Sequence, residues 1–258
     1  MSKRPVRMFS HTRTRLFWVL LAIPATPLDV EGQGERAQTA AEVHARAVAA
    51  QGGASALASH QSLHVQGRIE IAAQGLTGTV ESWRRRPGLT RSRAEFAGVG
   101  TIESGYDGTV AWSKNPMLGS RVLEGAELAA VAQDAMWSDD PTAVRSRTLV
   151  GEEEFEGRTC VVLRLVMKSG DERTSYYDLA TGLPAGAKVP RPTPQGEQII
   201  TVIVSDYRDV GGVKLPFRTA QRLGPVEQVL IAEHAEWDVN ADLSVFELPA
   251  DIRALVSK

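Results

Sequence analysis

The spacing of apolar residues divides the chain into a helical opening, a long series of strands and one inserted helix. The opening helix is predicted to begin at the capping box Thr39–Glu42 and to end at Gly52–Gly53, where glycine suits a left-handed cap. From Leu63 the apolar period changes from helical spacing to two, the period of a half-buried strand. We therefore expect a mainly β protein with a few helices.

The best-defined strands lie between Phe155 and Phe217, where β-branched and aromatic runs alternate with Gly, Asp and Pro turns. This pattern is typical of an antiparallel meander. Upstream, Asp107–Gly108 predicts a two-residue hairpin turn. The proline-rich segment 184–196 is predicted to be an extended surface loop, because proline cannot donate to a strand ladder.

The inserted helix is predicted between Gly125 and Trp137, because its apolar residues repeat at i, i+3, i+4, i+7 and i+8. These residues are Leu128, Val131, Ala132, Ala135 and Met136. We expect this helix to pack across the apolar face of the sheet. One later strand turns Val161, Leu163, Leu165 and Met167 to the same side. Leu128, Val131 and Met136 would cover that side, over either a dry core or a ligand cavity.

The first 28 residues differ from the rest, since they are basic and contain the short apolar run Leu16–Ile23. That run is too short to span a bilayer but suits a secretory signal peptide. Cleavage is predicted after Ala25 or as late as Ala37, and the mature protein is then periplasmic. A membrane anchor or a basic tail is the alternative.

The formal net charge is −2 and becomes more negative once the basic leader is removed. A net acidic surface argues against a nucleic-acid partner, whose phosphates attract basic proteins. One basic concentration remains, at Arg84, Arg85 and Arg86. It is either a patch for anionic head groups or an acidic partner, or charge that protects a strand edge from aggregation.

No arrangement of residues predicts catalysis. The chain lacks a nucleophile elbow, a phosphate-binding loop and a dinucleotide-binding turn. His60 and His64 are four apart, but His64 lies in a strand pattern, so the two should not share a helical face. The single cysteine, Cys160, lies in an apolar strand and is interpreted as a core residue. We expect no enzyme activity, no metal and no cofactor.

Several turn motifs resemble those of one exported superfamily. They are 106–108 with Trp112, 177–184, 206–216 and 240–249, after a helix that ends in Gly-Gly. Over residues 38–250 the chain resembles the LolA-like outer-membrane lipoprotein-sorting proteins.

The resemblance implies a single domain, an unclosed antiparallel β half-barrel covered by an N-terminal helix and the inserted helix as a lid. In that superfamily the cavity receives acyl chains, and in its carriers an arginine gates the cavity. The expected function is therefore an exported protein that binds acyl chains or a lipid-modified protein, with contact to a membrane surface. A sensing or protein-interaction domain with a filled core is the alternative.

Overall fold

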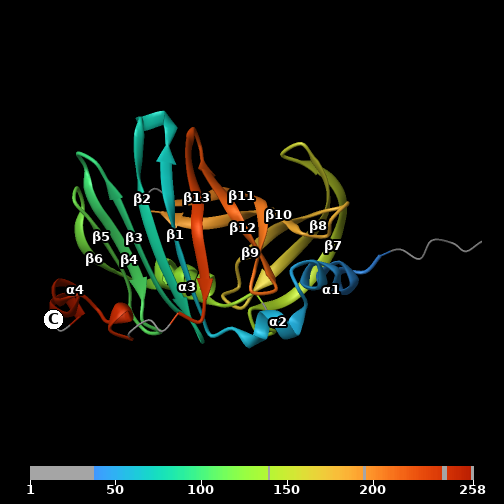
Figure 1. The fold of residues 1–258 in the computed structure, drawn as a ribbon, viewed down its shortest axis with the longest axis horizontal. Coiled ribbons are helices and arrows are strands. Elements are labelled where there is room, and N and C mark those ends of the chain that lie inside the picture. Colours follow the sequence, from blue (N-terminus) through green and yellow to red (C-terminus); the bar gives the residue numbers. More distant parts are fainter. Residues whose placement is uncertain (1–37, 139, 194–195, 240–242, 257–258) are drawn as a thin grey trace, which may run out of the picture. The chain divides into compact units, whose positions relative to one another are not determined.

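The computed structural model describes residues 38–138, 140–193, 196–239 and 243–256. The predicted signal peptide and both predicted cleavage sites lie outside these residues. From Gln38 on, the chain forms one compact unit built around a single sheet (Figure 1).

Every pair of neighbouring strands in this sheet is antiparallel. The strands are β1 Ser62–Ile71, β2 Leu76–Arg85, β3 Leu89–Phe96, β4 Gly100–Tyr106, β5 Ala111–Asn115, β6 Gly119–Leu123, β7 Val144–Phe155, β8 Arg158–Met167, β9 Glu172–Asp178, β10 Pro184–Thr193, β11 Gly196–Val210, β12 Val213–Leu223 and β13 Val226–Trp237.

The strand order shows why the sheet is unclosed. It runs β6-β5-β4-β3-β2-β1-β13-β12-β11-β10-β9-β8-β7, so the first strand pairs with the last in the middle of the sheet. The two edges, β6 and β7, are consecutive in the chain and are joined through α3, Gly125–Ala135. This helix contacts β4 and β5 on one side of the opening and β10 on the other. The predicted half-barrel with an inserted helix is confirmed.

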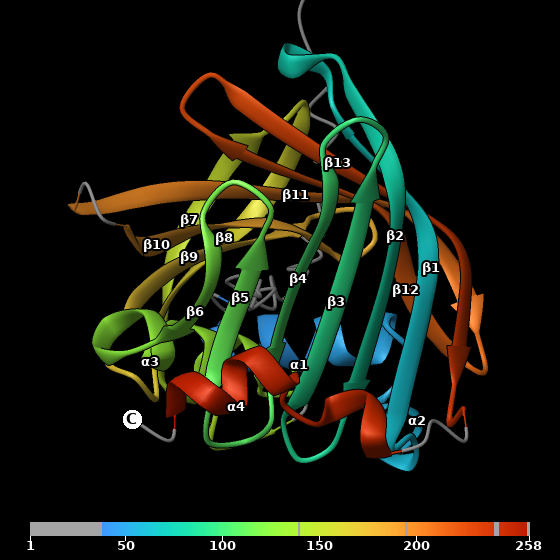
Figure 2. The same ribbon diagram turned by 90° about the vertical axis from the view of Figure 1, so that its left-hand side faces the viewer.

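The other helices gather with α3 toward one end of the sheet, the lower end in Figures 1 and 2. They are α1 Ala40–Ala50, α2 Ala54–Ser59 and α4 Ala250–Val256. Short 3-10 turns lie at Leu243–Phe246, before α4, and at Ala72–Gln74, in the connection between β1 and β2. The predicted capping box is present at α1, where Glu42 N donates to Thr39 Oγ1 at 3.2 Å and Thr39 N donates to Glu42 Oε2 at 2.7 Å. No helix in the described residues has the length and apolar character needed to cross a membrane.

Helix α4 was not predicted. It extends the folded domain beyond residue 250, the end expected from the sequence. Its Ile252 is fully buried, and α4 packs against β6. Asp251 accepts a hydrogen bond from Ser120 and lies 3.1 Å from Lys114 Nζ. These contacts lower the pKa of Asp251 to about 2, chiefly through the Ser120 and Lys114 hydrogen bonds.

The hairpin predicted at Asp107–Gly108 is present, but its turn is longer than the predicted two residues. Tyr106 pairs with Ala111, so four residues connect β4 to β5. Asp107 Oδ1 accepts hydrogen bonds from the backbone N–H groups of Thr109 and Val110 at 2.8 and 2.7 Å. The aspartate side chain thus stabilises a wider turn than the dipeptide alone predicts.

The predicted surface loop at 184–196 is wrong, because Pro184–Thr193 forms β10. Pairing of β10 with β9 ends at Lys188, whereas pairing with β11 continues to Thr193. Pro190 and Pro192 lie in the part that has lost its β9 neighbour. Proline has no backbone N–H, but on the side of a strand without a neighbour no hydrogen bond between strands is lost. Strands tolerate proline at such positions.

Strand β8 is buried on both faces over Cys160–Leu163. One face contributes Val161, Leu163, Leu165 and Met167 to a cluster with Val43 of α1. The opposite face contributes Cys160 and Val162 to a second cluster, in which Phe155 stacks on Tyr176 with ring centroids 4.0 Å apart. Cys160 is fully buried, as expected, and burial raises the pKa of its thiol.

Candidate ligand pocket

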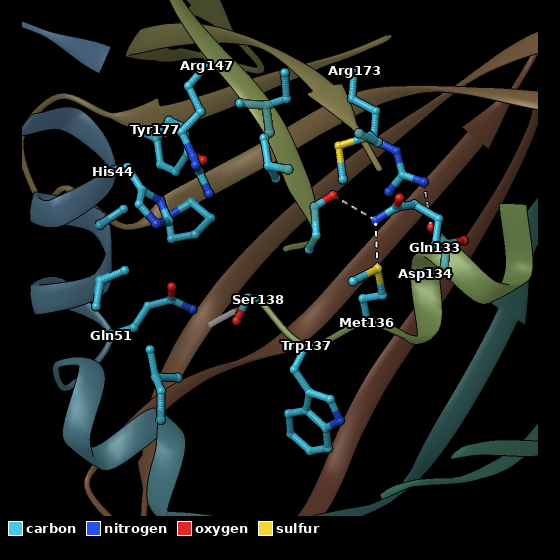
Figure 3. A pocket seen from close by; sticks show the side chains of 18 of the residues that line it. His44, Gln51, Gln133, Asp134, Met136, Trp137, Ser138, Arg147, Arg173 and Tyr177 are labelled. Atoms are coloured by element: carbon cyan, nitrogen blue, oxygen red, sulfur yellow. Dashed lines mark hydrogen bonds and ion pairs between the residues drawn. The ribbon is translucent and has the colours of Figure 1, made fainter. Parts of the chain in front are cut away.

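A pocket of about 450 Å³ lies between α1, the end of α3 and the concave side of the sheet. Its lining comes from α1 and α2, from the end of α3 and the segment after it, and from β1, β2, β7–β10, β12 and β13. The helical side includes His44, Ala47, Val48, Leu57, Gln133, Asp134, Met136 and Trp137. Figure 3 shows α1 on one side, the end of α3 on the other and the strands behind. The pocket is therefore bounded by both helices that were expected to cover the sheet.

Arg84 of β2 holds the end of α3 at this pocket. Its Nη2 donates to the backbone carbonyls of Asp134, Ala135 and Met136 at 3.2, 3.3 and 3.1 Å. The last carbonyls of a helix lack intrahelical donors, and a cation at this end also suits the helix dipole. Burial lowers the pKa of Arg84, and its Nε is buried with no hydrogen-bond partner among the described residues.

Trp137, two residues after the end of α3, lies against two of the predicted patch arginines. The guanidinium carbon of Arg84 lies 5.1 Å from the ring centroid and that of Arg86 lies 4.4 Å from it. Arg86 also donates to the carbonyls of His60 and Leu57 at 2.8 and 3.0 Å. Two arginines of the triplet thus bind helix ends and an indole ring instead of facing solvent together.

A row of three residues crosses the pocket wall in register. Arg147 of β7 pairs with Leu165 of β8, which pairs with Arg173 of β9. Directly opposed residues in antiparallel strands point to the same face, so both guanidinium groups lie on the pocket side. Arg173 Nη2 is 2.9 Å from Asp134 Oδ1, and Arg191 also forms an ion pair with Asp134.

His44 and Tyr177 lie beside Arg147 at the α1 end of the pocket (Figure 3). Burial, and then the positive charge of Arg147, lower the pKa of His44, so its imidazole is neutral at neutral pH. Burial raises the pKa of Tyr177, which keeps the phenol protonated, although Arg147 and a hydrogen bond with Ser175 lower it in part. Neither side chain supplies a negative charge to this end of the pocket.

Within the described residues no three His, Cys, Asp or Glu side chains come together to hold a metal ion. His60 Nδ1 lies 2.7 Å from Asp238 Oδ2, and His64 Nε2 lies 2.8 Å from Glu81 Oε1. The two histidines thus pair with different carboxylates.

No family model matches the chain, and no curated protein matches its sequence. Solved structures do match its fold. A DUF1329 family protein from Desulfovibrio piger aligns with a TM-score of 0.57 and 16% identity over 81% of this chain and 98% of its own. A LolA superfamily protein from Nitrosomonas europaea aligns with a TM-score of 0.55 and 14% identity over 82% and 99%.

A putative outer membrane lipoprotein-sorting protein domain from Vibrio parahaemolyticus aligns with a TM-score of 0.51 and 11% identity over 84% of this chain and 97% of its own. The chain has a LolA-like fold. At these identities the likeness concerns the fold alone, and the pocket must be interpreted from the residues of this chain.

Three of the seven predicted cavity residues line the pocket of this LolA-like fold: Met136, Leu165 and Met167. Val161 and Leu163 lie farther along β8, packed in the cluster with Val43. Leu128 and Val131 are half-buried on α3 and do not line the pocket. Ligand contact stays a prediction for all seven residues, and head-group binding stays a prediction for Arg84, Arg85 and Arg86.

The buried face of α3 differs from the predicted stripe. Its buried residues are Ala130, Gln133 and Ala135. Gln133 Nε2 donates to the carbonyl of Ala143 at 3.1 Å, and Gln133 Oε1 accepts from the N–H of Ser169 at 3.1 Å. A helix that contacts opposite sides of an opening buries more than one stripe, and a glutamine with both ends paired is stable there.

Sequence reasoning missed Arg147 and Arg173 as pocket residues. The available signal was their position in the strand alternation. Arg147 lies on the same strand face as Leu149, and Arg173 on the same face as Tyr177. Leu149 and Tyr177 both pack against the cluster under α1. An arginine on the apolar side of a strand indicates a buried charge that needs a partner.

Proposed function

We propose that this is an exported protein that binds acyl chains, of a lipid or of a lipid-modified protein, in the pocket between α1 and α3. The observation that carries the proposal is the pocket of about 450 Å³ on the concave side of an unclosed sheet. The likeness to a LolA superfamily protein and a lipoprotein-sorting domain supports it. The same comparisons favour a binding protein over an enzyme.

The size of the pocket favours one small amphiphile at a time. Small-molecule pockets range from about 300 to 1,000 Å³, and this one lies in the lower part of that range. Burial of a chain releases about 0.8 kcal/mol per methylene, or about 12 kcal/mol for sixteen carbons. Association costs roughly 4–15 kcal/mol, so one chain alone binds weakly and a polar contact would strengthen it.

Filling the pocket with protein tests the proposal. We expect Met136→Trp to weaken binding of a fluorescent fatty acid by about tenfold or more, because the indole takes space that the chain would occupy. Since that space is open, the melting temperature should fall by only a few degrees, less than overpacking of a filled core would cause. Fluorescence titration and thermal unfolding measure the two effects.

Leu128→Trp is the matched control, because Leu128 lies on the same helix but does not line the pocket. It should leave probe binding unchanged. Wild-type protein that binds no apolar probe would contradict the proposal, as would a Met136→Trp variant that binds like wild type.

We also propose that a signal peptide within the first 28 residues is removed on export, by cleavage after Ala25 or as late as after Ala37, and that the mature protein is periplasmic. The basic start and the short apolar run support this. N-terminal sequencing of protein from its native host should place the first residue after Ala25 or as late as after Ala37. A mature chain that begins at Met1 or Ser2 would overturn the assignment.

The second candidate function is a sensing or protein-interaction domain. One observation favours it, the turn between β5 and β6, where the side chains of Met117 and Leu118 are 79% and 77% exposed. Exposed apolar side chains at a hairpin tip suit contact with a partner protein. This candidate replaces the first if the protein binds no apolar probe.

A further inference from the structure

We infer that the ligand carries an anionic group and that Arg147 binds it at the α1 end of the pocket. The inference rests on the proposed function, since it names the chemical class of the ligand in that same pocket. The shared chemistry is a carboxylate or a phosphate joined to an apolar chain.

The first support is the charge balance of the pocket. Three arginines line it, Arg84, Arg147 and Arg173, against one carboxylate, that of Asp134. Arg84 donates to the carbonyls at the end of α3, and Arg173 is paired with Asp134. Asp134 also neutralises Arg191. The pocket therefore holds more positive charge than its own residues balance.

The second support is that Arg147 has no counter-ion among the residues that the structure describes. No hydrogen bond or ion pair joins it to another residue in the described parts of the chain. Its charge acts on His44 of α1 and on Tyr177 of β9, and both of these groups are neutral at neutral pH. A guanidinium offers five donors in a planar fork that matches a carboxylate or a phosphate.

The third support is position. Arg147 is in register with Leu165, an apolar residue of the pocket wall, and Arg173 lies on the next strand, about 10 Å from Arg147 between backbones. Apolar wall residues Met167 and Met136 continue from Leu165 toward α3. An amphiphile would thus place its head group near α1 and its chain along this wall.

The experiment compares ligands of equal chain length on wild-type protein by calorimetry. The ligands are a sixteen-carbon fatty acid, the corresponding alkyl phosphate and the corresponding primary alcohol. We expect the acid or the phosphate to bind about tenfold or more tightly than the alcohol, since charge-assisted hydrogen bonds are stronger than those between neutral groups. The more tightly bound of the two anions identifies the head group.

Arg147→Gln should remove this preference, so that the acid and the phosphate bind no more tightly than the alcohol. Arg145→Gln is the matched control, because Arg145 lies exposed on the same strand and should keep the preference. Equal binding of acid, phosphate and alcohol to wild type would overturn the inference and leave the proposed function standing. Loss of alcohol binding in Arg147→Gln would overturn it too, because the residue would then be structural. If no ligand binds wild type, the proposed function fails and this inference fails with it.

Discussion

Arg84→Met is expected to lower the free energy of unfolding by about 2–4 kcal/mol, since hydrogen bonds to a charged donor contribute about 1.5–3 kcal/mol and leave unpaired carbonyls when lost. Arg84 is the donor for three carbonyls at the end of α3, and the helix connects the two edge strands. Methionine keeps the length of the side chain and removes its donors. Urea unfolding of both proteins measures the change in free energy.

The same substitution should change access to the pocket. Without Arg84 the end of α3 is held mainly by Gln133 and by the ion pairs of Asp134. We expect faster entry and release of a fluorescent fatty acid, measured by stopped flow. Faster exchange would show that the contact of Arg84 with the end of α3 limits access to the pocket.

Two neighbouring changes control for this prediction. Arg84→Lys keeps the charge but lacks the planar fork, so its stability should lie between wild type and Arg84→Met. Arg85→Gln, next in the same strand, should unfold like wild type. An Arg84→Met variant with wild-type stability and wild-type ligand kinetics would show that α3 does not depend on this contact.

Gly67→Ala is expected to destabilise the fold by about 3 kcal/mol or more, as overpacking against backbone does when side chains cannot move away. A Cβ at Gly67 would lie 2.1 Å from the carbonyl oxygen of Ile231 and 2.9 Å from the Cα of Ala232. Gly67 is at the bulge where β1 pairs with β13. This pairing joins the two halves of the sheet, so β1 and β13 would have to separate there.

Gly75→Asn is the control for that substitution. Gly75 has φ +64°, and no atom lies within 4 Å of a Cβ built there. Asparagine tolerates this left-handed conformation, so the change should cost less than about 1 kcal/mol. Thermal and urea unfolding compare the two variants, and equal stability of both would contradict the close approach at Gly67.

Local signals were enough for most of the elements. The capping box at Thr39–Glu42 places the start of α1, because its two hydrogen bonds lie within four residues. The period of two from Leu63 onward predicts β1, since alternation reflects one buried face. The turn residues after β8 and β11 predict the hairpins that follow those strands, because turn geometry depends on local backbone preferences. In each case the deciding interaction is made by neighbours in sequence.

The candidate site depends on contacts that sequence spacing does not show. The period of α3 predicts a helix, but its buried face follows from contacts with β4, β5 and β10, which are far away in the chain. From the sequence alone, Pro190 and Pro192 predict a loop. They fit in strand β10 because its pairing with β9 ends at Lys188, before both prolines. From the sequence alone, Arg84 belongs to a basic run that is expected to be exposed. In the structure it donates a hydrogen bond to the carbonyl of Met136 at the end of α3.

The sequence by itself determined that this chain is a β meander with a capped first helix and one inserted helix, because those features come from local hydrogen bonding and side-chain period. Only the tertiary structure decided that the inserted helix joins the two edges of the sheet, and that Arg147, Leu165 and Arg173 share one wall of a pocket. The physical reason is register. Which residues of β7, β8 and β9 stand side by side is set by the pairing of whole strands, bulges included, and no single segment carries that information.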